Sequence, residues 1–251
     1  MDQQPDQYTD EQIEFMVHRG NSIRKPLLDR KPHIKKYYKI RGLFSDILDS
    51  MATYYEKGKF EQTVNRKILA QNGPYGKKGF EKKNLDFDMT TSQGQHAFEE
   101  VNVFKFAPHL SCITEDFIKK KQFKNPEQQE FLQSMLHSVT GLFEVVDTQP
   151  FVGYATLRNV LTGKEQQIVD IGLSGTGAQP DIYLFTRIIT YRGISISSGL
   201  ALFFMKDDPY MMEYVQRMKK EPEQTDGAMF VDLYTRYSQV EGSVKVIRNL
   251  I

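Results

Sequence analysis

The sequence predicts an α+β protein with a helical N-terminal half, a small antiparallel β barrel or curled sheet, and C-terminal helices. Three observations support this prediction. Apolar residues recur every three or four positions in the first half, they alternate between tight turns after position 141, and proline and aspartate mark new helices after position 207. We expect three regions: a mainly helical, locally basic region at 1–124, a helix with a β module at 125–206, and helices that pack on the core at 207–251.

The N-terminal region contains three predicted helices. Thr9 and Gln12 are spaced as a capping box, which opens a short helix to about Arg19. Pro32 suits the first turn of a longer helix that reaches about Glu56, and a third helix is expected at 60–70. The long helix has one apolar stripe, which we expect to pack against other helices of the same chain: Tyr37, Ile40, Phe44, Ile47, Met51 and Tyr54.

The segment before the β module has a mixed pattern. Leu85, Phe87 and Met89 alternate as a short strand does, whereas 97–106 fits a helix or a strand. Asn125 and Pro126 then predict a helix start.

Five strands follow in the predicted β module. Tight turns are expected at 161–164 and 191–193, and the glycine-rich residues 174–177 are interpreted as a turn between strands. Beyond the module, Asp208 caps a helix and a last helix begins near Asp226. Short strands joined by tight turns favour a small barrel or strongly curled sheet. The predicted strands are 143–146, 153–161, 166–169, 182–189 and 194–204.

Composition predicts a cytoplasmic protein. The single cysteine, Cys112, excludes an internal disulfide. Residues 1–12 are polar and acidic, unlike a signal peptide, and no apolar run approaches the roughly 20 residues of a membrane span. We therefore expect no membrane partner, and the oligomeric state stays open.

Charge is unevenly distributed along the chain. Positions 19–83 hold 17 Lys or Arg residues against 6 Asp or Glu residues, a net charge of +11, although the whole chain is at +1. Basic and aromatic residues are interleaved within this stretch, a pattern that suits phosphates and unpaired bases. The sequence therefore predicts a binding protein for an anionic partner, either nucleic acid or an acidic protein. The candidate contacts are Lys35, Lys36, Arg41, Lys77, Lys78, Lys82 and Lys83.

Part of the chain resembles a known module. The runs 141–146, 157–164 and 185–189 carry the resemblance, which extends over residues 125–205. The module occurs in uncharacterised bacterial proteins, often near a SEC-C zinc knuckle. The resemblance implies a bacterial protein with a small β fold and implies no activity. The knuckle itself needs several cysteines, and this chain has one.

The sequence contains no recognisable catalytic motif. We therefore expect no cofactor and no resident metal, and a binding protein is favoured over an enzyme. Two alternatives stay open. A metal-assisted hydrolase would use Asp86, Asp88, His96 and Glu100, whose carboxylates and imidazole are metal ligands. A structural subunit would use the apolar stripe of the long helix and the C-terminal helix as its interface.

Overall fold

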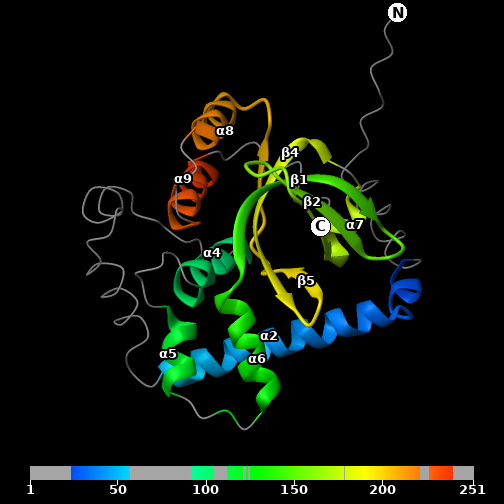
Figure 1. The fold of residues 1–251 in the computed structure, drawn as a ribbon, viewed down its shortest axis with the longest axis vertical. Coiled ribbons are helices and arrows are strands. Elements are labelled where there is room, and N and C mark those ends of the chain that lie inside the picture. The colour runs from blue at the N-terminus through cyan, green and yellow to red at the C-terminus, as the bar shows by residue number, and fades with distance from the viewer. Residues whose placement is uncertain are drawn as a thin grey trace, which may run out of the picture.

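The computed structural model describes residues 24–56, 92–104, 112–120, 123, 125–177, 179–220 and 226–239. Its centre is an antiparallel sheet of six strands that curls into a nearly closed barrel, with helices at both ends (Figure 1). The strands are β1 (Val139–Gln149), β2 (Tyr154–Asn159), β3 (Glu165–Val169), β4 (Gln179–Tyr191), β5 (Ile194–Ser197) and β6 (Leu202–Met205). The helices are α2 (Pro32–Glu56), α4 (Ser92–Val103), α5 (Ile113–Lys120), α6 (Pro126–Leu136), α7 (Ile171–Gly175), α8 (Pro209–Lys220) and α9 (Asp226–Gln239).

Strand order explains how the sheet curls. The hydrogen-bonded order is β3-β2-β1-β4-β5, and β6 also pairs with β4. The register of β1 shifts once against β2 and once against β4, and such bulges bend a strand. The two ends of the order meet at a seam, where Gln166 Nε2 donates to Ser195 Oγ at 3.0 Å. The predicted α+β barrel-like fold is therefore confirmed.

Strand β4 is buried on both faces. Leu184 and Ile188 face the barrel interior, where they join an apolar cluster with β1, β2 and β3. On the opposite face, Phe185 packs with α8 and α9, and Ile189 packs with α2 and α6. A strand covered on both sides reads as a nearly continuous apolar run, which is the pattern of this segment.

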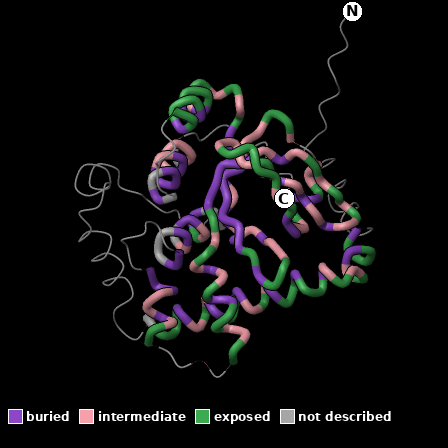
Figure 2. Tube along the Cα trace, viewed as in Figure 1, coloured by how far each residue is buried: buried purple, intermediate pink, exposed green. Residues whose placement is uncertain are grey.

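Helix α2 packs along its apolar stripe. Five of the six stripe residues are buried in one cluster with α5, α6 and part of the sheet, whereas Tyr54 is 43% exposed. The prediction that the stripe packs within the chain is confirmed for those five residues. Its outward side carries the exposed positions that Figure 2 shows along this helix.

Two predictions about the β module were wrong. The glycine-rich residues 174–177 were expected to be only a turn, but α7 occupies 171–175 because the Asp170 side chain accepts from Leu173 N at 2.9 Å and caps it. The predicted strand at 194–204 is two strands, β5 and β6. Between them Gly199 has φ +109, a conformation that interrupts a regular strand.

Several predicted helices are confirmed, and other predicted elements lie outside the described residues. The helix starts at Pro126, Pro209 and Asp226 are confirmed, and 92–103 is helical. The predicted helices at 9–19 and 60–70 and the strand near Phe87 lie outside the described residues. The division into three regions stays a prediction. Among the described helices, none has both the length and the apolar character needed to cross a membrane.

Candidate anion-binding surface

The start of α2 carries a strong excess of basic residues. Between positions 24 and 41 the chain has eight Lys or Arg residues and one acid, Asp29. The rest of the helix has acids and no Lys or Arg. We define the basic end of α2 as four cations that lie just before or within its first two turns: Arg30, Lys31, Lys35 and Lys36.

Packing of the stripe turns these cations outward. Successive residues of an α-helix are about 100° apart around its axis. Lys31 and Lys35 therefore lie on the side opposite Phe44, which is buried. Arg30, Lys35 and Lys36 are exposed, and Lys31 is partly exposed. The apolar pattern of α2 thus fixes where its basic side chains point.

Arg24 anchors the residues just before α2 to the barrel. Its side chain is buried and donates from Nε to Pro150 O at 2.7 Å and from Nη2 to Ser174 Oγ at 2.7 Å. A third bond runs to Ile171 O. Burial lowers the pKa of the Arg24 guanidinium, and the charge of Asp170 opposes that shift. Arg24 is therefore a structural cation and not part of the exposed surface.

His33 makes a second contact between α2 and the sheet. Its Nε2 lies 2.6 Å from Val152 O, and because a carbonyl can only accept, this nitrogen carries the proton. Its ring stacks on Tyr154 with centroids 4.6 Å apart. The basic end of α2 is thus held rigidly beside the turn between β1 and β2.

Arg41 differs from the other predicted contacts on α2. Its Nη1 donates to Ser197 O at 3.0 Å, and its guanidinium lies 5.8 Å from the Tyr37 ring centroid. Part of its hydrogen-bonding capacity is therefore used to join α2 to β5. Lys35 and Lys36, in contrast, lie on the outer surface.

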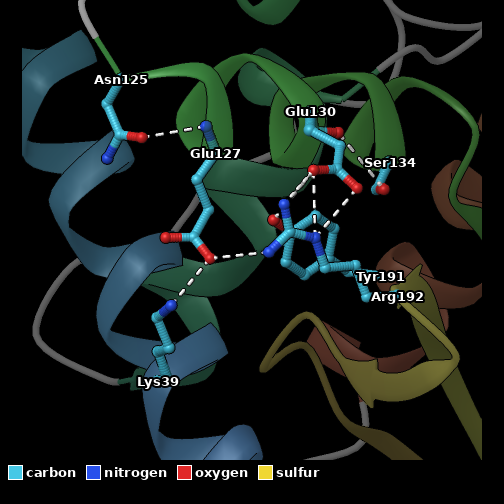
Figure 3. A network of polar contacts seen from close by, with 7 residues as sticks. All are labelled: Lys39, Asn125, Glu127, Glu130, Ser134, Tyr191 and Arg192. Atoms are coloured by element: carbon cyan, nitrogen blue, oxygen red, sulfur yellow. Dashed lines mark hydrogen bonds and ion pairs between the residues drawn. The ribbon is translucent and has the colours of Figure 1, made fainter.

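A network of ion pairs joins Lys39 of α2 to α6 and to Arg192 after β4 (Figure 3). Lys39 Nζ and Arg192 Nη1 both contact Glu127 Oε1, at 2.8 and 3.0 Å. Arg192 also contacts Glu130 at 2.5 Å, and Asn125 caps the helix that carries both acids. A hydrogen bond from Lys39 lowers the pKa of Glu127, and one from Arg192 lowers that of Glu130. These cations are locally neutralised.

The basic end of α2 lacks such neutralisation. Within the part of the chain that the structure describes, no acidic side chain lies within 4.0 Å of its four cations. Several exposed or partly exposed cations elsewhere have acidic partners: Lys25, Lys206, Arg158, Arg217 and Arg236. The charge of this surface is therefore available to a ligand.

The sequence predicted part of this surface. Lys35 and Lys36 were among the predicted contacts, whereas Arg30 and Lys31 were not, although they form a basic pair directly before Pro32. The other four predicted contacts lie outside the described residues: Lys77, Lys78, Lys82 and Lys83.

The hydrolase alternative gains no support from α4. Glu100 is buried and its Oε1 lies 2.5 Å from Arg187 Nε, so the carboxylate already has a cationic partner. His96 contacts Glu99 at 3.1 Å. Asp86 and Asp88 lie outside the described residues. Among the residues that are described, no three potential metal ligands cluster.

Both surfaces of the structural-subunit alternative are packed within the chain itself. Five of the six stripe residues are covered by the chain itself, so they are not available to a second subunit. The last predicted helix is also packed, because Phe230 and Leu233 of α9 are buried in the cluster with α8 and β6. A subunit interface would have to use other surfaces.

Comparison with known proteins gives one match. A family model described as a family of unknown function (DUF7986) matches residues 31–243. No curated protein and no solved structure matches the chain. The resemblance of residues 125–205 to a bacterial β module stays a prediction.

Proposed function

The chain belongs to a family of unknown function, DUF7986, and we propose that it is a binding protein that holds an anionic partner on the basic end of α2. The partner would be nucleic acid or an acidic protein. No bond is broken in this function. Affinity would come from charge attraction at Arg30, Lys31, Lys35 and Lys36, and it would weaken as salt screens these charges.

The main support for the proposal is that the four cations lie at the N-terminal end of α2, where positive charge lowers the stability of a helix. The N-terminal end of a helix dipole is positive, so acids stabilise it and cations destabilise it. The first turn of α2 has no acid, and Lys31, Lys35 and Lys36 lie next to it. Residues that break a local rule without an evident structural gain are expected at functional or strained sites, and no strained backbone angle is found at these four positions.

The same placement favours an incoming anion. The positive end of the dipole adds to the field of the side chains, so both attract negative charge to one place. Arg24 and His33 hold this end of α2 against the barrel, so little ordering is needed on binding. An anion would supply the negative charge that the helix start lacks.

Binding to labelled polyanions across a salt series tests the proposal. The probes are a single-stranded RNA, a DNA duplex and polyglutamate, followed by fluorescence anisotropy. The test variant is Lys35→Ala with Lys36→Ala, which removes two charges from the basic end of α2. We expect wild type to bind at least one probe at low salt and the variant to bind it more weakly.

A matched control separates local charge from total charge. Lys164→Ala with Lys219→Ala also removes two positive charges, but from exposed positions outside α2. It is expected to bind as wild type does. Equal affinities for the two double variants, or no binding of any probe at low salt, would refute a binding site at the basic end of α2.

A further inference from the structure

An aromatic ring is exposed beside the basic end of α2. Tyr38 is 42% exposed, and helical spacing places it on the same outward side as Lys31 and Lys35. The other aromatic residue of this segment, Tyr37, belongs to the buried stripe. The Tyr38 ring contacts the edge of the helix through Tyr37, with ring centroids 5.7 Å apart, and much of its surface stays open to solvent.

The Tyr38 ring is held in place by its neighbours. Its hydroxyl donates to Asp29 Oδ1 at 3.1 Å. Lys25, which forms an ion pair with Asp29 at 2.8 Å, has its ammonium 5.7 Å from the ring centroid. These contacts order the side chain before a partner arrives, which reduces the entropy lost on binding.

Gly42 keeps the surface after Tyr38 uncovered. It is an exposed residue inside α2, and a Cβ built on it meets nothing within 4 Å. Its φ is not positive, so the backbone does not require glycine there. Glycine is a poor helix residue compared with alanine. A side chain at this position would lean back over the turn that carries Tyr38, because helical side chains point toward the N-terminus.

We propose that the partner is single-stranded nucleic acid, with its phosphates on the basic end of α2 and one base stacked on Tyr38. This inference rests on the proposed function and names the class of its partner. An acidic protein would use the cations and leave the ordered ring without a role. A duplex keeps its bases stacked inside, whereas a single strand offers base faces to an aromatic side chain.

Selective loss of RNA binding tests the role of the ring. The probes are labelled oligouridine of about 12 nucleotides, within the range that small single-strand-binding folds cover, a duplex of equal length, and polyglutamate. Wild type is expected to prefer oligouridine. Tyr38→Ala is expected to weaken oligouridine binding by roughly 5- to 150-fold, with a much smaller change for polyglutamate. Tyr38→Phe keeps the ring and should recover most of the affinity.

Gly42→Leu provides an independent test that cannot be explained by unfolding. Leucine favours a helix over glycine, so the variant should melt at a higher temperature than wild type. The same side chain should cover the approach to Tyr38 and weaken oligouridine binding. Thermal unfolding and anisotropy on one preparation measure both effects.

The possible results distinguish a stacking role of Tyr38 from anion binding at the basic end of α2. If Tyr38→Ala and Gly42→Leu bind oligouridine as wild type does, while Lys35→Ala with Lys36→Ala loses binding, the stacking role is refuted and the anion surface stands. If polyglutamate binds more tightly than oligouridine, the partner class is refuted. If the double lysine variant also binds every probe as wild type does, both fail.

Discussion

Glu100 and Arg187, which are 87 positions apart in the sequence, form an ion pair with Oε1 and Nε 2.5 Å apart. Their side chains are 1% and 2% exposed. Thr140 donates to the same carboxylate oxygen at 3.3 Å, and Arg187 Nη1 donates to Ser138 Oγ at 3.0 Å. The guanidinium also lies 4.7 Å from the Phe104 ring centroid. This cluster joins α4 to β4 and β1.

Removing one partner of this pair should be strongly destabilising. Glu100→Gln leaves the buried Arg187 charge without its counter-ion, a change that costs about 3–5 kcal/mol in buried pairs. The paired replacement Glu100→Leu with Arg187→Met removes both charges and should cost less than the single change. Urea unfolding monitored by circular dichroism measures both. A Glu100→Gln midpoint equal to that of wild type would contradict a structural role for the pair.

Asp170 should contribute to stability through two contacts. One oxygen caps α7 at Leu173 N, and the other accepts from Ser197 Oγ at 2.7 Å. Asp170→Ala removes both and should lower the free energy of unfolding by roughly 1–3 kcal/mol. Asp181→Ala, at an exposed position of β4, is the control and should change it by less than about 0.5 kcal/mol. Similar losses for the two variants would refute the capping role.

The network in Figure 3 should give a pH-dependent contribution to stability. The pKa values of Glu127 and Glu130 are lowered by hydrogen bonds from Lys39 and Arg192. A carboxylate with a lowered pKa in the folded state stabilises the protein above its unfolded pKa, about 4.3 for Glu, and loses that effect as pH falls through the folded value. Arg192→Gln should therefore lower the melting temperature at neutral pH and have little effect in acid.

Melting curves across pH measure this difference directly. The difference in melting temperature between wild type and Arg192→Gln should also become smaller in high salt, because the ion pairs are exposed to solvent. A gap that is constant across pH would show that Arg192 acts through packing and not through these carboxylates.

Charge reversal at the start of α2 should stabilise the fold. Lys35→Glu places an acid near the positive end of the helix dipole, and such a change is worth about 0.3–1 kcal/mol at low ionic strength. Urea unfolding at low salt measures it, with Lys164→Glu, at an exposed turn, as the control. A Lys35→Glu variant less stable than wild type would remove the main support for a functional reason behind these cations.

Local signals predicted much of the fold. The apolar stripe from Tyr37 to Met51 predicted that α2 is a helix and which of its sides is buried. Asn125 and Asp208 predicted helix starts. Both signals come from residues close together in the sequence, so they can be recognised without the structure. The break at Gly199 was not foreseeable in this way. It lies against the His96 ring, which comes from α4, so its conformation depends on tertiary packing.

The candidate site was predictable only in part. Basic composition selected Lys35 and Lys36, but it could not distinguish them from Arg41, whose partner Ser197 lies 156 positions away. Likewise, the apolar run along β4 predicts a strand and gives no sign that Arg187 is buried against Glu100. Partners that are distant in sequence decide which cations are available to a ligand.

The salt dependence of single-stranded RNA binding tests the role of α2 most directly. For single strands, the slope of log Kobs against log salt concentration is about −0.7 per phosphate contact. If Lys35 and Lys36 each neutralise a phosphate, Lys35→Ala with Lys36→Ala should make the slope shallower by about 1.4. Identical slopes for wild type and this variant would contradict a binding site at the basic end of α2.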